Sequence, residues 1–306
     1  MASQAKLVLN CVGPFRLHGD PVVAACVEAG CDYLDICGEP EFMERMEAVY
    51  HEKAVEMGSL LISACGFDSI PAEFGFMFNS SQWVSPAVPN RVEDYINIES
   101  DKRIPGYAPP KVSTIEHQKK IGLWAVKLPS ADATVVRRTL SILTENPTSL
   151  QGVNEDPKQA EKRVAFWSRV KPAHFGVKAA TKSLLGLLPC LGTFRKKSTP
   201  TKDELESASF KMWFVGHGFS DVNLASQGSA TPDTEIITRV MGPDVGYLTT
   251  SIILVQCALI ILEQRGDLPK GGVFTPGIVF GHTDLQDRLQ ENGVSFDLIS
   301  KSRFYT

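Results

Sequence analysis

Apolar runs at 7–10, 33–36 and 59–64 open the chain, and each leads into a corner that contains glycine. Two stretches with helical spacing, about 21–29 and 40–57, separate these runs. Apolar runs that alternate with helical stretches are typical of βαβαβ units. The pattern therefore predicts a parallel sheet at the start of the chain.

The corners that follow the three predicted strands carry the first candidate residues for function. In a parallel sheet the carboxyl ends of the strands share one edge, and open α/β sheets bind their ligands there. Gly13, Gly38 and Gly66 would let the backbone approach a ligand closely. Polar groups at the same edge would come from Asn10, Glu39, Asp68 and Ser69.

The same polar residues also have structural interpretations. Asn10 is alternatively the cap of its own turn, and Glu39 a first-turn carboxylate that the helix dipole favours. Asp68 is alternatively the N-cap of the next helix. At the earlier helix, Asp20 is predicted as the N-cap and Pro21 as the first helical residue.

The pattern changes from about residue 79, where a linker begins. Runs at 208–218 and 235–240 predict a hairpin, and 249–263 is apolar on all sides and predicts a buried helix. Other expected elements are strands at 92–98, 122–128 and 294–299, a capped element at 130–146, a helical pattern over 162–188, a loop from 271 to 276 and a helix at 284–292. The sequence thus predicts an α/β domain over 1–80 and an α+β domain with an antiparallel sheet over 81–306.

Composition excludes several classes of function. The chain has 306 residues, a net charge of −4 and a pI of about 5.9, so it lacks the basic character of nucleic-acid-binding proteins. Seven cysteines without a C-x-x-C pair indicate a reduced, intracellular chain. Cys11, Cys37 and Cys65 are interpreted as small residues that pack at strand ends. We expect no signal or transit peptide and, without a run of 18 apolar residues, no transmembrane helix.

Several catalytic motifs are missing from the sequence. The six histidines are scattered without H-x-x-x-H or H-E-x-x-H spacing, so we expect no metal site. We find no phosphate-binding P-loop, no G-x-S-x-G and no G-x-G-x-x-G. Gly216-His217-Gly218 lacks the third glycine and a following helix, and it is interpreted as a turn or strand end.

Six distinctive sequence blocks are spread along the chain: LVLNCVGPF at 7–15, GDPVVAAC at 19–26, DYLDICGE at 32–39, GFDSIPAE at 66–73, VRRT at 136–139 and GGVFTPG at 271–277. Together these blocks resemble the saccharopine dehydrogenase-like oxidoreductase family of eukaryotes. The resemblance covers nearly the whole chain. It implies a Rossmann-like parallel sheet, followed by a domain that shapes the substrate pocket and the dimer face.

The resemblance also implies an NAD or NADP cofactor and a substrate that is a small molecule or a lipid, in lipid or glycolipid metabolism. It implies a location at the mitochondrion or at a lipid droplet or membrane surface. No catalytic acid or base is assigned. The residues expected to bind the cofactor are Asn10, Cys11, Gly13, Pro14, Phe15, Gly38, Glu39, Gly66, Phe67, Asp68 and Ser69.

The chain departs from the family pattern at the front. The family opens with a glycine-rich G-A-S-G-F-T-G turn, and this chain starts at about the fourth strand of that domain. Because a helix N-terminus with its free N–H groups binds the pyrophosphate, we expect NAD(P) affinity to be weak or absent. The alternative hypothesis is therefore a truncated, non-catalytic binding or regulatory form. Residues 173–192, which are apolar and include lysines, are a candidate for contact with a lipid surface. The alternative interpretation is an ordinary amphipathic helix that packs on the core.

Overall fold

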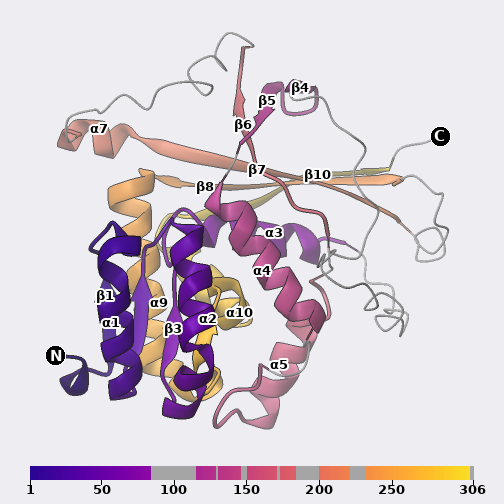
Figure 1. Cartoon of the computed structure of the whole chain (residues 1–306). Coiled ribbons are helices and arrows are strands. Elements are labelled where there is room, and N and C mark those ends of the chain that lie inside the picture. The colour runs from indigo at the N-terminus through magenta and orange to yellow at the C-terminus, as the bar shows by residue number, and fades with distance from the viewer. Residues whose placement is uncertain are drawn as a thin grey trace.

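The computed structural model of the chain describes residues 1–83, 115–128, 130–145, 150–170, 173–183, 200–220 and 232–303. These residues form a four-stranded parallel sheet and two three-stranded antiparallel sheets, arranged with helices as Figure 1 shows. The predicted combination of α/β and α+β structure is confirmed. The predicted strand at 92–98 and residues 184–192 lie outside the described part.

The parallel sheet has the strand order β1-β2-β3-β9. Its first three strands and two connecting helices match the predicted βαβαβ unit: β1 (Leu7–Asn10), α1 (Phe15–Ala29), β2 (Asp32–Asp35), α2 (Pro40–Met57) and β3 (Leu60–Ile62). The fourth strand, β9 (Gly272–Phe274), pairs in parallel with β3, where the sequence predicted a loop. That prediction was wrong because three residues are too few to show a periodic pattern.

Side chains alternate between the two faces of the parallel sheet, as the pleat requires. Tyr33 and Leu61 belong to the apolar cluster under α1 and α2. Leu34, Leu60 and Ile62 belong to the opposite cluster, which includes α9 (Thr250–Gln264). Figure 1 accordingly shows α1 and α2 on one side of the sheet and α9 on the other.

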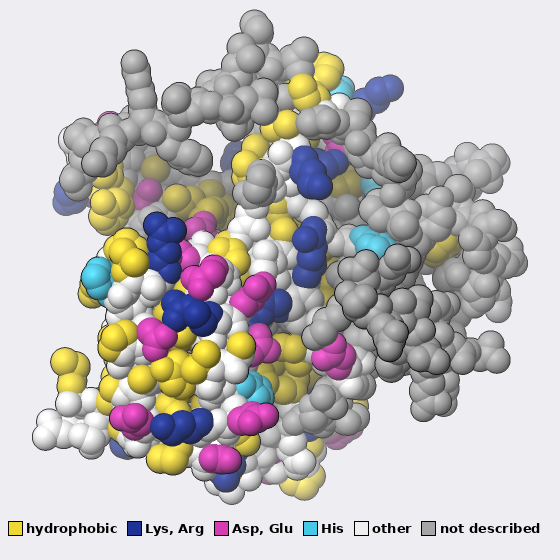
Figure 2. All heavy atoms as spheres, viewed as in Figure 1, with side chains coloured by type: hydrophobic (Ala, Val, Ile, Leu, Met, Phe, Trp, Pro, Cys, Tyr) yellow, Lys and Arg dark blue, Asp and Glu magenta, His cyan; other side chains and the backbone are white. Residues whose placement is uncertain are grey.

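Helix α1 begins at Phe15, six residues before Pro21, the first helical residue that the sequence predicted. Asp20 and Pro21 therefore lie inside the helix, and the predicted N-cap was wrong. The Asp20 carboxylate instead accepts hydrogen bonds of 2.7 Å from Arg45 and from the Tyr50 hydroxyl, both on α2. Over α1 and α2, Figure 2 shows acidic and basic side chains interspersed on one face, in keeping with such inter-helix pairs.

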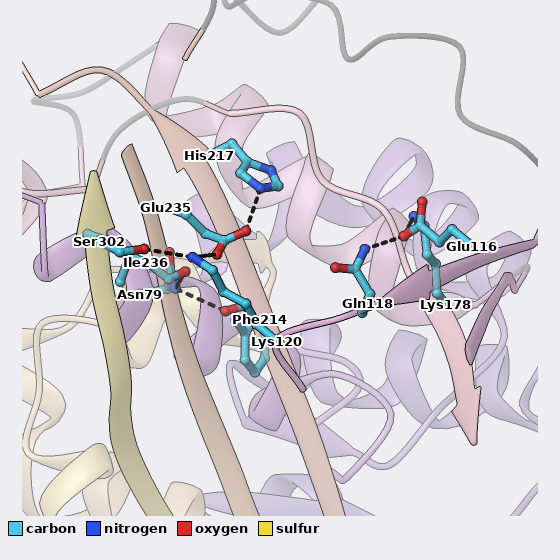
Figure 3. Close-up of polar contacts among 10 residues, drawn as sticks. All are labelled: Asn79, Glu116, Gln118, Lys120, Lys178, Phe214, His217, Glu235, Ile236 and Ser302. Atoms are coloured by element: carbon cyan, nitrogen blue, oxygen red, sulfur yellow. Dashed lines mark hydrogen bonds and ion pairs between the residues drawn. The ribbon is translucent and has the colours of Figure 1, made fainter. Parts of the chain in front are cut away.

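The larger antiparallel sheet has the order β10-β8-β7 and packs on α3 (Ile70–Ser81). Its strands β7 (Ser209–Gly218) and β8 (Thr234–Pro243) confirm the predicted hairpin, and β10 (Ser295–Arg303) confirms the last strand. The Asn79 amide of α3 donates to the carbonyls of Phe214 and Ile236, at 3.3 and 3.2 Å. This amide links the end of α3 to two strands at once (Figure 3).

The smaller antiparallel sheet joins β4 (Ile115–Gln118), β5 (Leu123–Lys127) and β6 (Lys178–Thr181). Lys120, in the turn between β4 and β5, forms an ion pair of 2.5 Å with Glu235 of β8 and donates to the Ser302 hydroxyl of β10 at 2.7 Å (Figure 3). Strand β6 lies where the sequence predicted a helix. The prediction was wrong there because pairing with β5, far away in sequence, decides the conformation.

The remaining helices pack largely on other helices, for example α4 and α10 on α3 and α11 on α9. The capped element predicted at 130–146 is α4, and the predicted C-terminal helix is α11. The elements are η1 (Ala2–Gln4), α4 (Ala131–Glu145), α5 (Pro157–Trp167), α7 (Lys202–Ser207), the π-turn η4 (Val245–Thr249), η5 (Arg265–Asp267), α10 (Pro276–Phe280) and α11 (Leu285–Glu291).

Helix α9 buries one face and exposes the other. Ile253, Cys257 and Ile260 are buried, whereas Leu259 and Leu262 are exposed, so the predicted all-round burial was wrong. With its flanking turns the helix spans Val245–Asp267, and by length and composition it is apolar enough to cross a membrane. In its most apolar stretch 39% of the residues are buried inside the protein.

The main apolar core extends over both predicted domains. It combines Leu34 and Ile62 from the parallel sheet with Phe210 and Val240 from the antiparallel sheet. The division at residue 80 stays a prediction. What the structure adds is a shared core, which holds the two sheets in a fixed relation around the ends of β2 and β3.

Candidate functional site

A cavity of about 210 Å³ lies at the carboxyl ends of β2 and β3. This is the edge at which the sequence predicted a ligand site. The turns after β2 and β3 form two walls of the cavity. The third wall comes from η4 and the first residue of α9, which follow the antiparallel strand β8. The lining residues are Ile36, Cys37, Ala64, Gly66, Phe67, Asp68, Val245, Gly246 and Thr250. We call this cavity the edge pocket.

Asp35, the last residue of β2, holds the two turns beneath the edge pocket. Its carboxylate is fully buried and accepts 2.9 Å hydrogen bonds from the backbone N–H groups of Cys37 and Ala64. Its second oxygen accepts from the hydroxyls of Tyr33 and Ser63, also at 2.9 Å. Burial raises the pKa of Asp35 to about 6, although these four donors favour the charged form.

The backbone of Ala64 is strained at the pocket. Its φ of 64° lies in the left-handed region, which costs energy for a residue with a Cβ. The hydrogen bond from Ala64 N–H to Asp35 and a 2.7 Å bond from Cys65 N–H to the Asp35 carbonyl hold this conformation. Strained residues that the surrounding structure fixes are found preferentially at ligand sites.

Thr250 joins the antiparallel side of the molecule to the strand-end side. Its hydroxyl accepts from the backbone N–H of Phe67 at 3.2 Å and donates to the Val245 carbonyl at 2.7 Å. A Cβ on Gly66 would lie 3.1 Å from the Thr250 methyl group, which explains why a glycine is needed there. These contacts fix the third wall of the edge pocket without a charged group.

Asp68 is the single charged residue among the described residues that line the edge pocket. Its carboxyl meets solvent at the pocket mouth and lies against Gly38, where a Cβ would come within 2.9 Å of Asp68 Oδ2. The surrounding protein raises the pKa of this carboxyl through desolvation. The alternative role of Asp68 as N-cap is wrong, because the helix α3 begins after Ser69 and no side chain caps it.

Asp132, in the first turn of α4, is a buried carboxyl that the sequence did not single out and that does not line the edge pocket. Its Oδ2 accepts from the Ser130 hydroxyl at 2.9 Å, and its buried Oδ1 has no hydrogen-bond partner among the described residues. Burial, together with repulsion by Asp68, raises the pKa of Asp132 to about 6. The only sequence signal was the Ser-x-Asp start of a helical pattern.

Several predicted cofactor residues lie away from the edge pocket. The Asn10 amide donates to Tyr33 at 3.1 Å and its oxygen accepts from Val12 N–H at 3.1 Å, so this side chain caps its own turn. The Glu39 carboxylate accepts from the N–H groups of Phe15 and Arg16, at 2.8 and 3.2 Å. It therefore stabilises the start of α1 rather than its own helix.

The other predicted residues divide between pocket, core and surface. Gly66, Phe67 and Asp68 line the edge pocket and Gly38 borders it. Phe15 is buried against Phe42, and Ser69 is buried with its hydroxyl on Glu73. Cys11, Gly13 and Pro14 are exposed in the loop before α1. Sequence reasoning missed the lining residues Ile36, Cys37, Ala64, Val245, Gly246 and Thr250, the last three because their neighbours in space come from distant segments.

The size and polarity of the edge pocket fit part of a dinucleotide. Pockets that enclose a drug-sized ligand measure roughly 300–1,000 Å³. At about 210 Å³ the edge pocket would hold one ring-sized group, such as a nicotinamide, with Phe67 and Ile36 as apolar wall. The Cys37 thiol is not a candidate nucleophile, because burial raises its pKa to about 12 and keeps it protonated.

Two further features of the described part bear on the site. No three His, Cys, Asp or Glu side chains within it are grouped as a metal site requires. A second cavity, of about 250 Å³, lies at the other end of the antiparallel sheet between Trp83, Phe219 and Lys301. It shares no lining residue with the edge pocket.

No family model matches the chain. A probable mitochondrial saccharopine dehydrogenase-like oxidoreductase of Arabidopsis thaliana is 55% identical, over 98% of this chain and 80% of the relative. A saccharopine dehydrogenase-like oxidoreductase of Mus musculus is 35% identical, over 99% of this chain and 79% of the relative.

A third relative carries a different kind of name. The lipid droplet localized protein of Caenorhabditis elegans is 30% identical, over 98% of this chain and 81% of the relative. The three similarities extend over almost the entire chain and include proteins from plants, mammals and nematodes. The resemblance seen in the sequence blocks is confirmed, and the chain belongs to the saccharopine dehydrogenase-like oxidoreductase family.

Proposed function

We propose that the chain is an NAD(P)-dependent oxidoreductase. The nicotinamide end of the cofactor and the substrate meet in the edge pocket. The observation that carries this proposal is the pocket at the carboxyl ends of β2 and β3, with one carboxyl at its mouth. That position is where open α/β sheets bind ligands. The relatives named as oxidoreductases support the reaction class.

A bound nicotinamide would supply the hydride chemistry. The chain's own residues would hold the reacting groups in place. Phe67 and Ile36 offer an apolar wall for a ring, and Thr250 fixes the Phe67 backbone through its hydroxyl. Asp35 keeps the Cys37 and Ala64 turns from moving, so that the pocket is formed before a ligand arrives.

Cofactor binding by the whole chain tests the proposal. Titration of NADPH and NADH, followed by calorimetry and by cofactor fluorescence, should show weak but saturable binding below millimolar cofactor. Gly246→Trp places an indole in the pocket lining, where a Cβ would meet no atom closer than 4.0 Å, and it should weaken binding at least tenfold. Gly176→Trp is the matched control, because a Cβ there also meets no atom within 4 Å.

Two results would count against the proposal. One is an absence of binding by the wild-type chain up to millimolar cofactor, which would favour the alternative of a non-catalytic binding or regulatory form. The other is equal weakening by Gly246→Trp and Gly176→Trp, which would place the cofactor elsewhere.

We further propose that the protein works at a lipid surface on a lipid-related substrate. The relative named for lipid droplets supports this, as does the exposed apolar side of α9. Val255, Leu259 and Leu262 recur at spacings of four and three residues, so they share one face of the helix. An apolar helix face of this kind gains free energy from burial at the boundary between headgroups and acyl chains.

Flotation with phospholipid-coated triolein droplets tests the lipid proposal. The double change Leu259→Asp and Leu262→Asp should reduce the floating fraction several-fold, because two charges on this face would have to leave water. Val164→Asp on α5 is the matched control, since Val164 is also exposed. Unchanged flotation of the double variant would reject α9 as the contact surface.

A further inference from the structure

The second cavity lies where the C-terminus of α3 meets the ends of β7 and β10 and the start of β8, and we call it the basic cavity. Its volume is about 250 Å³. Of the described residues that line it, Lys301 and Arg303 are cationic and none is acidic. A concave surface with charges of one sign attracts ligands of the opposite sign, so the basic cavity favours anions.

The basic cavity is separate from the edge pocket. The two share no lining residue, and they lie at opposite ends of β8, which runs from Thr234 to Pro243. At about 3.4 Å per residue, a strand of this length separates the two cavities by roughly 30 Å. A ligand in the basic cavity therefore occupies a site of its own.

Two glycines of β7 make room for one wall of the basic cavity. Gly216 and Gly218 belong to the Gly-His-Gly sequence that lacks the features of a phosphate-binding turn. A Cβ on Gly218 would lie 2.9 Å from the indole of Trp83, and a Cβ on Gly216 would lie 3.4 Å from it. Alternate residues of a strand share one face, so both glycines leave the same face open for the indole. Trp83 thus presents a flat apolar surface to the cavity, which Phe219 also lines.

The hydroxyl groups of the lining are already engaged within the protein. The hydroxyls of Ser220 and Thr234 both donate to the Asp233 carboxylate, which also accepts from the Ser220 backbone N–H at 2.7 Å. The Ser302 hydroxyl accepts from Lys120 at 2.7 Å (Figure 3). Asp233 is the acidic group that contacts the lining, and these three donors stabilise its charge. The polar capacity that remains for a ligand is therefore cationic.

The two cations have unused hydrogen-bond donors. Lys301 and Arg303 are two residues apart on the edge strand β10, so their side chains leave the same face. The Lys301 ammonium donates to the Gln82 carbonyl at 2.7 Å, which leaves two of its three N–H donors. The guanidinium of Arg303 has five N–H donors and makes no hydrogen bond or ion pair with another described residue. Charged residues also protect edge strands from pairing, but that role alone needs no apolar wall beside them.

We propose that the basic cavity binds a phosphate monoester that carries an apolar body. A phosphate monoester has a charge of about −1.5 to −2 at pH 7 and three acceptor oxygens, which match the two cations and their unused donors. The apolar body lies against the rings of Trp83 and Phe219. At about 250 Å³ the cavity is smaller than pockets for drug-sized ligands, so it holds the phosphate and a few carbon atoms.

This chemistry is shared by soluble alkyl phosphates and by phosphatidic acid in a lipid surface. The inference does not rest on the proposed oxidoreductase function, because no redox step is assigned to the basic cavity. It adds a second ligand site to the protein, at the far end of the antiparallel sheet from the edge pocket.

Calorimetric titration of the whole chain with hexyl phosphate tests the site. We expect saturable binding below millimolar ligand, and Arg303→Gln should weaken it at least fivefold. Arg303 is exposed and has no partner among the described residues, so this change removes no contact within the described fold. Lys301→Gln should weaken binding at least threefold. Lys211→Gln, also at an exposed lysine but on β7, is the matched control and should change the affinity less than twofold.

Two related probes separate charge from apolar contact. Hexanol lacks the charge and inorganic phosphate lacks the apolar body, so each should bind at least fivefold more weakly than hexyl phosphate. An absence of saturable hexyl phosphate binding, or equal weakening by Arg303→Gln and Lys211→Gln, would overturn the proposal. So would inorganic phosphate that binds as tightly as hexyl phosphate.

NMR of the ¹⁵N-labelled chain locates the ligand. The indole N–H signal of Trp83, assigned with Trp83→Phe, should shift on saturation with hexyl phosphate, whereas the signals of Trp124 and Trp167 should not. In a separate titration, Gly246→Trp in the edge pocket should leave hexyl phosphate binding unchanged. Loss of binding in Gly246→Trp, or binding without a shift of the Trp83 signal, would place the ligand elsewhere and overturn the proposal.

Vesicles distinguish the two sources of the phosphate. Contact through the uncharged face of α9 should be equal on phosphatidylcholine vesicles with and without phosphatidic acid. A gain in flotation that requires phosphatidic acid and is lost in Arg303→Gln would identify a lipid headgroup as the ligand. Arg303-dependent binding of hexyl phosphate without such a gain would identify a soluble phosphate ester. Binding that is independent of Arg303 with both probes would reject the basic cavity as a phosphate site.

Discussion

Replacing Asp35 with alanine should lower the free energy of unfolding by about 3–5 kcal/mol and abolish ligand binding in the edge pocket. The change leaves the buried N–H groups of Cys37 and Ala64 without acceptors, and each unpaired buried donor costs about 1–3 kcal/mol. It also releases the strained Ala64 backbone. Urea unfolding followed by circular dichroism measures the loss, and exposed Glu41→Ala should change stability by less than about 0.5 kcal/mol.

Asp35→Asn keeps a hydrogen-bond acceptor at this position but removes the charge and the titrating proton. The asparagine oxygen can still accept from Cys37 and Ala64, so this variant should fold. Burial raises the pKa of Asp35 from 3.8 to about 6, so the folded chain binds this proton more tightly than the unfolded chain. The contribution of Asp35 to stability therefore falls as pH rises from about 4 through about 6. In Asp35→Asn that part of the pH dependence should disappear, and an unchanged slope would show that Asp35 is not its source.

Replacing Glu73 with alanine should destabilise the fold to a similar extent, by about 3–5 kcal/mol. Its buried carboxyl joins three helices: it accepts from Ser69 at the start of α3, from the Thr139 hydroxyl of α4 and, at 2.8 Å, from Gly277 N–H of α10. Alanine leaves these donors unpaired and opens a cavity. The closeness of packing is shown at Gly277, where a Cβ would lie 2.4 Å from Glu73 Oε1.

Glu73→Gln should preserve most of this stability and remove a pH dependence. Burial raises the pKa of Glu73 from 4.5 to about 7, more than its hydrogen bonds lower it. The folded chain therefore binds the proton more tightly, and stability falls as pH rises from about 4.5 through about 7. Urea unfolding of both chains at pH 5, 6, 7 and 8 measures the difference. Parallel curves for wild type and Glu73→Gln would contradict this assignment.

Both residues lie under the candidate site rather than in it. Asp35 fixes the Cys37 and Ala64 turns that line the edge pocket. Glu73 fixes α4 against α3, the helix that begins shortly after the pocket residue Asp68. Loss of ligand binding in Asp35→Ala is therefore expected at temperatures where this variant remains folded.

Local pattern was sufficient for much of the fold. The runs at 7–10, 33–36 and 59–64 predicted three parallel strands because apolar residues alternate with helical stretches, and the hairpin of β7 and β8 followed from two long apolar runs. The carboxyl edge as ligand site also followed from sequence, since strand ends in a parallel sheet must meet. Gly66, Phe67 and Asp68 could be placed there for the same reason.

Residues whose partners lie far away in the chain could not be placed in this way. Glu39 follows β2 and precedes α2, yet its carboxylate accepts from the N–H group of Phe15, where α1 begins instead of at the predicted Pro21. Strand β6 adopted an extended conformation in a helical pattern because β5 pairs with it. Each outcome depends on hydrogen bonds between segments that local spacing does not relate.

By itself, then, the sequence determined which segments are strands of the parallel sheet, where its ligand edge lies and to which family the chain belongs. The tertiary structure decided the fourth strand β9, the third wall of the edge pocket and the burial of Asp132. The physical reason is that apolar periodicity encodes which face of an element is buried. Which elements become neighbours in the core depends on buried polar groups such as Asp35 and Glu73. Their hydrogen-bond donors belong to other segments and come within reach only once the elements have packed.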